Sequence, residues 1–407
     1  MTRALARLAA VLLGAMTAPA CAANTVTIGA IYPFARDPAA HAALEVAAEV
    51  INTPHDGLAA LPLGAGQGLP ALGGAKIAVD FADDLDNPSA AEAQALRLAG
   101  GGHVAALIGG GGTAATLAAA RVAERHRMPF LTPDDAAPSL AGRGFGFVFR
   151  LAPLAAGNAK VFAELLGAAK AAGTRVATVA LVFEDSAFGH AEAGALRDTL
   201  TAAGFATADI AYAGGAADLS APVAALKERN PDAVIFVSRA ADAILFAKTM
   251  QNAGYKAPIE IGDDAGFSDP VFVAAVGNLM QGLIGRSVWR LGKPDSPAAI
   301  VNGLYKAKTG RDLDAASAQI IEGLLVLADA INRAGSTDSA AIQAALRRTD
   351  LKRDQLIVGY DSVAFDASGQ NTLAATYLTQ LQDKHYVTIW PADQADAKLA
   401  LPFKGWE

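Results

Sequence analysis

Four consecutive glycines, Gly109–Gly112, separate an apolar run from an alanine-rich stretch that begins at Thr113. Glycine lets a backbone approach a ligand closely, and the first amides of a helix lack partners within that helix. Together with the positive end of the helix dipole, these N–H groups can hold a carboxylate or another hydrogen-bond acceptor. The Thr113 hydroxyl either caps the helix or donates to the ligand. A purely structural interpretation, in which the glycines only let strand and helix pack closely, stays open here.

Two cofactor patterns can be compared with the glycine run. A P-loop is excluded because no Gly-Lys-Ser/Thr follows. A dinucleotide fingerprint fits better, since Gly109, Gly111 and Ala114 match G-x-G-x-x-A. Asp134 or Asp135 then follows at a distance that suits a ribose hydroxyl. However, this run follows the third expected strand, whereas the fingerprint normally marks the first strand-to-helix turn. We expect no cofactor, and an exported NAD(P)-dependent oxidoreductase is the alternative function.

Residue types that serve catalysis or metal binding are sparse. The six histidines are scattered without H-E-x-x-H spacing, one cysteine is present, and no G-x-S-x-G elbow occurs. We therefore expect neither an enzyme nor a metal site. A divalent ion held by Asp134, Asp135 and Asp264 is a minor alternative.

The first 23 residues have the pattern of a secretory signal. A positively charged start precedes an apolar stretch over residues 8–15, and small residues follow. This pattern predicts export to the periplasm. Cys21 lies in A-P-A-C, which resembles a lipoprotein box without its leucine, so lipid anchoring at Cys21 is the alternative.

After Asn24, short apolar runs rich in β-branched residues alternate with helical stretches, the pattern of βαβ units and parallel sheets. With 407 residues, 53% of them hydrophobic, the chain is too long for one core and suits two Rossmann-like lobes. The net charge of −7, without a Lys/Arg cluster, argues against a nucleic-acid partner. We expect strands over residues 25–32, 76–82, 104–109, 128–132, 175–183, 205–212, 232–238, 257–262, 281–288, 377–381 and 386–390.

Two other regions depart from this alternation. Residues 52–75 are too rich in Gly and Pro for helix or strand, which predicts a long surface loop. Residues 297–348 contain three helical segments with little strand signal.

Several segments in order, among them "LIGGGGTAAT", "FVFRLAP", "FEDSAFG" and "GDDAGFSDP", resemble type I periplasmic solute-binding proteins. The resemblance is to the branched-chain amino-acid and amide binders of ATP-driven importers, and it runs from about Thr25 to the C-terminus. It implies two α/β lobes with parallel sheets, joined by three hinge crossings around a ligand. The implied crossings lie near residues 150–153, 286–288 and 365–372. The expected first lobe is then 24–152 plus 287–366, and the second is 153–286 plus 367–407.

The resemblance also assigns roles to individual residues. Thr113 takes the place of the family serine that holds the ligand carboxylate beside helix amides, here those of Gly111, Gly112 and Ala114. Asp264, in G-D-D-A, matches the acid that pairs with the ligand ammonium.

Other positions depart from the family pattern. Asp134 replaces a small residue whose backbone carbonyl contacts the ligand, and Ala136 replaces a hydroxyl residue. Phe188 and Arg239 each replace a ligand-contacting aromatic residue. Because small-ligand clefts are mostly apolar, we expect Phe188 and Tyr32 to form walls.

The two adjacent aspartates bear on the ligand. A carboxylate about 4 Å from a second one loses roughly 4 kcal/mol at an effective dielectric near 20. Either Asp134 and Asp135 point away and pair with a cation such as Arg143, or the ligand is not a plain amino acid. We favour a ligand with amine, amide or hydroxyl donors.

The expected function is a non-catalytic, monomeric periplasmic receptor. It would close around a small polar solute and deliver it to an inner-membrane ABC permease. A sensory module that binds the same kind of solute is a further alternative.

Overall fold

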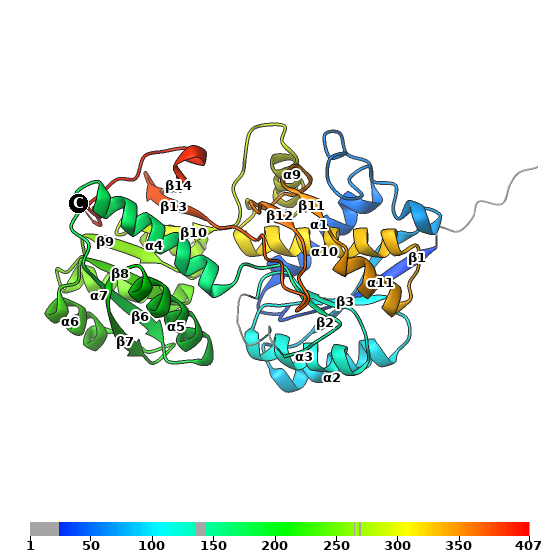
Figure 1. Ribbon diagram of the computed structural model, residues 1–407, viewed down its shortest axis with the longest axis horizontal. Helices are drawn as coiled ribbons and strands as arrows, with labels where there is room; N and C mark the ends of the chain where they lie inside the picture. Colours follow the sequence, from blue (N-terminus) through cyan, green and yellow to red (C-terminus); the bar gives the residue numbers. More distant parts are fainter. Residues whose placement is uncertain (1–23, 136–139, 141–142, 264, 268–269, 407) are drawn as a thin grey trace, which may run out of the picture.

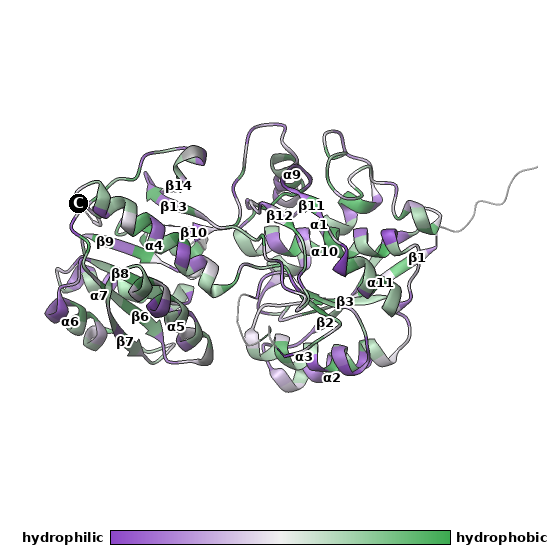
Figure 2. Ribbon diagram, in the orientation of Figure 1, coloured by the Kyte–Doolittle hydropathy of each residue, from purple (hydrophilic) through white to green (hydrophobic). Residues whose placement is uncertain are grey.

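A computed structural model describes residues 24–135, 140, 143–263, 265–267 and 270–406. These residues form two lobes that lie next to each other along the long axis of the molecule (Figure 1). Each lobe has a sheet in its middle with helices on both faces. In Figure 2 the central strands are mostly hydrophobic, and hydrophilic residues are frequent on the outer helices.

The first lobe contains a five-stranded, all-parallel sheet of order β2-β1-β3-β4-β5. The strands are β1 (Thr25–Tyr32), β2 (Lys76–Asp83), β3 (Ala106–Gly109), β4 (Phe130–Thr132) and β5 (Val148–Arg150). Helices α2 (Pro88–Gly100) and α3 (Thr113–Arg125) cover one face, and α1 (Pro38–Asn52) and α10 (Ala315–Ala334) cover the other. Alternation places Leu107 and Phe130 in the first of these cores and Ile108 and Leu131 in the second.

Helices α9 (Pro297–Thr309) and α11 (Ser339–Arg347) complete the first lobe and contribute to the same core as α1 and α10. A small antiparallel pair, β11 (Leu351–Lys352) with β12 (Ser362–Val363), follows them. The Gly- and Pro-rich segment after α1 contains a 3-10 helix at Pro70–Leu72. Three of its leucines, Leu58, Leu61 and Leu69, are buried in the core, so this segment is anchored and does not merely lie on the surface.

The second lobe contains a seven-stranded sheet of order β14-β13-β10-β9-β8-β6-β7. The strands are β6 (Thr178–Glu184), β7 (Ala206–Tyr212), β8 (Ala233–Val237), β9 (Ile259–Gly262), β10 (Ile284–Ser287), β13 (Tyr377–Gln382) and β14 (His385–Trp390). The first five are parallel, and β13 and β14 add an antiparallel edge. Helices α4 (Ala155–Ala171) and α5 (Ala187–Ala202) cover one face, and α6 (Ser220–Arg229), α7 (Ala240–Asn252) and α8 (Pro270–Val276) cover the other.

The predicted fold class, two α/β lobes with parallel sheets, is confirmed, and each expected strand overlaps an observed one. The sequence analysis missed β5 because its three residues are too few to show a period and adjoin the expected crossing. Among the described residues, α10 is the one helix long and apolar enough to cross a membrane by length and composition. Most of it is buried in the core of the first lobe.

The chain passes between the two sheets after β5, after β10 and before β13. The first and third passages are hydrogen bonded to each other. The Arg150 amide donates to the Gly369 carbonyl at 2.8 Å, and the Asn371 amide donates to the Arg150 carbonyl at 2.9 Å. The Gln370 side chain adds a bond to the Ala152 carbonyl at 3.0 Å. Residues 369–371 therefore run beside β5 before the chain enters β13.

Glu322, on α10, is a fully buried carboxyl group close to the second passage. Its Oε2 accepts the Ile357 amide at 2.7 Å, whereas its Oε1 has no hydrogen-bond partner. Two residues further on, the Gly359 amide donates to the Val288 carbonyl at 2.7 Å. Burial raises the pKa of Glu322 to about 7, against the opposing effect of the backbone amides of Ile357 and Val358.

The raised pKa of Glu322 predicts how the stability of the chain depends on pH. The unfolded chain loses this proton near the ordinary pKa, whereas the folded chain keeps it until about pH 7. The stabilisation is therefore complete below the ordinary pKa and is lost as the pH rises to 7. We expect Glu322→Gln to reduce the fall in unfolding free energy between pH 5 and pH 8 by about 2 kcal/mol.

Urea denaturation at the two pH values measures this difference. Glu164→Gln, an exposed change on α4, is the matched control and should keep the wild-type fall. An equal fall in the wild type and in Glu322→Gln would show that this carboxyl group is not its source.

Candidate functional site

The carboxyl ends of β1, β3 and β4 meet at one edge of the first sheet. They bring together Tyr32, the glycine run after β3, and Asp134 after β4. In open α/β sheets ligands bind outside this edge, because loops and helix N-termini converge there. The expected site residues of the first lobe thus lie where such a site forms.

Each glycine of the run has its own reason for lacking a side chain. A Cβ on Gly109 would lie 2.9 Å from the Ile31 carbonyl oxygen, so this glycine allows close strand packing. A Cβ on Gly110 would lie 1.8 Å from Oδ1 of Asp134. Gly111 has a φ of +85°, a conformation that favours glycine. The close-packing interpretation therefore holds for Gly109, whereas Gly110 makes room for a carboxylate of the chain itself.

Asp134 is a partly buried carboxyl group at this edge. Its Oδ1 is inaccessible and has no hydrogen-bond partner. Burial, followed by the negative charges of Asp135 and Asp37, raises the pKa of Asp134 to about 7, and a backbone hydrogen bond from Gly111 acts in the opposite direction. Asp134 therefore changes charge near neutral pH.

Tyr32, at the end of β1, is completely buried. Its hydroxyl interacts with the Asp134 side chain. Burial and the adjacent charge of Asp134 raise its pKa above the usual range. Tyr32 is thus buried next to Asp134 and does not form an exposed wall. Contact between Tyr32 and a solute stays a prediction.

Thr113 is the first residue of α3, and its hydroxyl does not cap that helix. Instead it donates to Oδ1 of Asp135 at 3.3 Å. Gly112 is the N-cap residue, and both Gly111 and Ala114 are exposed at this helix start. The helix end therefore faces two carboxylates of the chain.

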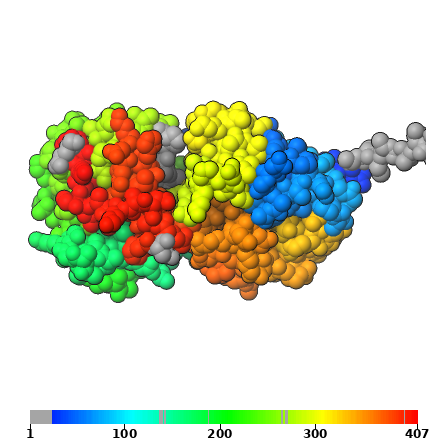
Figure 3. Space-filling model, turned by 90° about the horizontal axis from the view of Figure 1, so that it is seen from above, coloured from blue at the N-terminus to red at the C-terminus, as the bar shows by residue number. Residues whose placement is uncertain are grey.

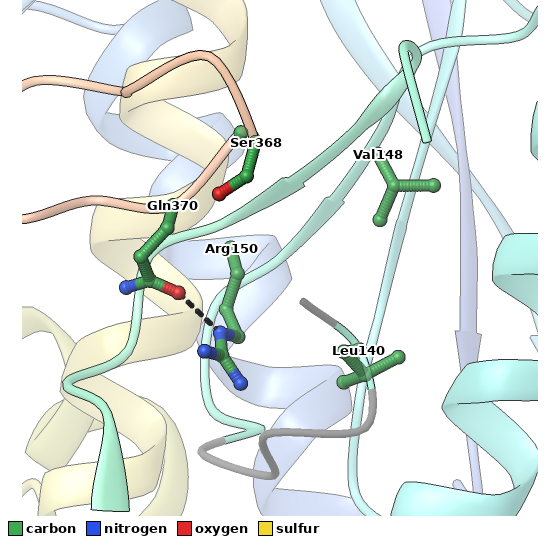
Figure 4. A pocket seen from close by; sticks show the side chains of 6 residues that line it. Leu140, Val148, Arg150, Ser368 and Gln370 are labelled. Atoms are coloured by element: carbon green, nitrogen blue, oxygen red, sulfur yellow. Dashed lines mark hydrogen bonds between the residues drawn. The ribbon is translucent and has the colours of Figure 1, made fainter. Parts of the chain in front are cut away.

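Arg150 is the buried cation near Asp135. Burial lowers the pKa of Arg150 to about 10, and the charges of Asp135 and Glu192 oppose this change. Its Nε donates to the Gln370 side chain. Figure 4 shows this pair beside a small pocket, which is lined by Leu140, Val148, Arg150, Ser368, Gly369 and Gln370. Arg150 was not predicted from the sequence, although its position at a strand end was an available signal, and a pairing of Arg143 with these aspartates stays a prediction.

The second lobe presents charged residues at the corresponding edge of its sheet. Arg239 is the N-cap residue of α7, with a side chain that is 59% exposed, and its Nε lies 3.6 Å from Oε2 of Glu184 at the end of β6. Phe188, on α5, is half-buried against the core formed with α4. Arg239 and Phe188 thus both lie at helix starts on this edge.

Asp263 and Arg286 form an ion pair beside these residues. Asp263 is fully buried, and Nε of Arg286 donates to both its carbonyl oxygen and its Oδ1 at 2.8 Å. The sequence analysis missed this pair. Two expected site residues, Asp264 and Ala136, lie outside the described residues.

Tyr360 lies between the turn after β4 and the second passage. It is fully buried, and its hydroxyl accepts from the Gln319 side chain at 2.8 Å. The same Gln319 nitrogen donates at 3.3 Å to the carbonyl of Pro133, which precedes Asp134. The Gly359 amide, next to Tyr360, donates to the carbonyl of Val288, two residues after Arg286, at 2.7 Å. Figure 3 shows the surface indented between the lobes when seen from above.

Metal ligands do not gather here in the part of the chain that the structure describes. No group of three or more His, Cys, Asp or Glu residues there could hold a metal ion.

Comparison with known proteins decides the family. Residues 25–385 match the family model described as periplasmic binding protein. The chain belongs to this family. A relative from Brucella abortus (strain 2308), named Leu/Ile/Val-binding protein homolog 8, is 29% identical over 336 residues, covering 80% of this chain and 83% of the relative.

Two solved structures of the family share its fold. The isoleucine complex of the branched-chain amino acid transporter substrate binding protein from Streptococcus pneumoniae superposes with a TM-score of 0.74 at 20% identity, covering 93% of this chain and 100% of the other. A solute binding protein from Rhodopseudomonas palustris BisB5, in complex with 3,4-dihydroxy benzoic acid, gives a TM-score of 0.71 at 18% identity, covering 88% and 93%. The resemblance inferred from the sequence is thereby confirmed.

The contact between Gly110 and Asp134 can be tested through stability. In Gly110→Ala the added methyl group would overlap the Asp134 carboxylate, whose Oδ1 is inaccessible and has little free space. We expect this variant to lose about 1–2 kcal/mol of unfolding free energy.

Thermal or urea unfolding measures the effect. Gly303→Ala is the control, because the added methyl group meets nothing on the exposed side of α9. It should be neutral or stabilising by about 0.5–1 kcal/mol. Equal stability of the two variants would mean that the carboxylate does not press on Gly110.

Proposed function

We propose that this chain is the solute receptor of an ABC importer and binds a small polar solute between its two lobes. The observation that carries the proposal is the set of hydrogen bonds that connects the two edges: Gln319 donates both to Tyr360 and to the carbonyl that precedes Asp134, and the residue before Tyr360 donates to Val288, which follows the strand of Arg286. A solute placed there would contact both lobes. Family membership supports solute binding as the general activity.

Closure of the lobes follows from differential affinity. A solute that contacts both edges binds the closed form more tightly than the open form, and therefore shifts the hinge equilibrium toward closure. The three passages between the sheets are the segments that would bend. Residues proposed to contact the solute are Thr113 and Asp134 in the first lobe, and Phe188, Arg239 and Asp264 in the second.

Binding is proposed in preference to catalysis. A dinucleotide would place its pyrophosphate on the amides that follow β3. Asp134 already lies against Gly110 and accepts from Gly111, so a pyrophosphate would meet a carboxylate there. This contact disfavours the oxidoreductase alternative.

The accompanying proposals concern place and partner. The signal-like N-terminus supports export to the periplasm, where the mature chain would act as a monomer and deliver its solute to an inner-membrane permease. Lipid anchoring at Cys21 and a sensory role are the alternatives. Residues 1–23 lie outside the described part of the chain.

A solute screen tests the function. Saturation at about 100 times the Kd stabilises a folded protein by about 2.7 kcal/mol, which raises the Tm of a chain of this size by several degrees. We expect such a rise with at least one amine, amide, amino acid or polyol, together with a smaller radius of gyration in small-angle X-ray scattering.

NADH serves as the comparison ligand in the same screen. Saturable NADH binding would favour the oxidoreductase. Binding of a solute without compaction would contradict closure of the lobes.

The role proposed for Asp264 has its own test. Loss of a hydrogen bond to a charged group costs about 1.5–3 kcal/mol, so Asp264→Ala should weaken binding of the screened solute at least tenfold. Calorimetric titration measures the affinity, and Asp198→Ala, an exposed change on α5, is the control. Unchanged affinity in Asp264→Ala would remove this residue from the site.

A further inference from the structure

We propose that the Asp134 carboxylate is a resident occupant of the anion seat at the start of α3, and that the solute therefore presents a hydrogen-bond donor, not a carboxylate, to this seat. The seat consists of the backbone amides of residues 111–113 and the Thr113 hydroxyl, because the Gly110 amide donates to the Ile31 carbonyl at 3.3 Å. The inference rests on the proposed function for its statement about the solute. Occupation of the seat is a property of the chain alone.

Asp134 fills the space beside the turn after β3. The Asp134 carboxylate lies so close to Gly110 that a Cβ there would come within 1.8 Å of Oδ1 and 2.7 Å of Cγ. The next amide, that of Gly111, forms a backbone hydrogen bond to the same carboxylate. A ligand carboxylate placed against this turn would need the volume that Asp134 fills.

The Thr113 hydroxyl is another donor of the seat. In the expected arrangement the Thr113 hydroxyl donates to the ligand. In the structure it donates to Oδ1 of Asp135 at 3.3 Å. Two carboxylates of the chain thus use the donors that the family resemblance reserves for a ligand carboxylate.

The seat is surrounded by negative charge. Besides burial, the charges of Asp135 and Asp37 raise the pKa of Asp134. Another carboxylate would add to this repulsion. A donor would reduce it.

Only part of the Asp134 side chain is available to a solute. Its Oδ1 is inaccessible and lies beside the completely buried Tyr32, which interacts with it. Asp134 as a whole is partly exposed, and a donor from a solute would bind to this exposed part. The chemistry that fits is an ammonium, amide N–H or hydroxyl at the end of the solute that enters the first lobe.

Acetate is a probe that tests the seat without knowledge of the solute. The backbone amide resonances of Gly111 and Gly112 are followed by NMR in the full chain while acetate is added. We expect no saturable shift in the wild type. Asp134→Ala empties the seat and should bind acetate at least tenfold more tightly, with saturable shifts of both amides.

Two further variants separate occupation from charge. Asp134→Asn removes the charge but keeps the seat filled, so it should behave as the wild type does. Asp86→Ala removes a carboxylate that lies 2.8 Å from the Cβ position of Gly112, and should also behave as the wild type does. If Asp134→Ala fails to fold, Asp134→Ser replaces it with the same expectation.

Saturable acetate shifts in the wild type would overturn the proposal, as would equal acetate binding by Asp134→Asn and Asp134→Ala.

The preference for a donor over a carboxylate is tested by calorimetry, in which the affinities for L-leucine (the acid) and L-leucinamide (the amide) are compared. Asp134→Ala should change the affinity ratio of acid to amide at least tenfold in favour of the acid, and an unchanged ratio would contradict the stated preference for donors. If no compound causes compaction but the acetate result holds, the proposed function fails and the occupied seat stands.

Discussion

The contact between the Asp134 carboxylate and the bare Gly110 backbone is the constraint on which the first-lobe site depends. Because this carboxylate fills the turn after β3, the turn needs glycine, and the following helix start has an acidic partner from the neighbouring strand. A carboxylate in so little water holds its proton up to about neutral pH, which its pKa of about 7 expresses. The Asp134 carboxylate, a group of the protein itself, therefore determines the shape of this site.

The same principle recurs at the other buried charges. Asp135 lies near Arg150, and Asp263 lies against Arg286, so these two carboxylates each have a cation nearby on a β-strand next to a passage between the lobes. Such pairs offset part of the cost of removing charge from water. Arg150 also donates a hydrogen bond to Gln370 of the third passage, so the cation near Asp135 contacts a segment that connects the lobes.

The passages are themselves well ordered by hydrogen bonds. Residues 369–371 bond to β5 and the first passage, and the Gly359 amide bonds to Val288 of the second. Bending between the lobes would therefore be confined to short segments on either side of these bonds. Rigid lobes that move about short connections are the usual basis of hinge closure.

The sequence determined the architecture. Helices and strands differ in the spacing of their apolar residues, and this spacing can be read from short stretches of the chain. It also placed Gly111, Thr113 and Asp134 at one edge, since parallel strands end together. Tertiary structure alone decided what the side chains do there. That Thr113 donates to Asp135, that Tyr32 is buried beside Asp134, and that Arg150 is a cation near Asp135 all depend on contacts between residues 15 or more positions apart in the chain. No local pattern encodes such contacts, because their energies depend on distance and burial in the folded chain.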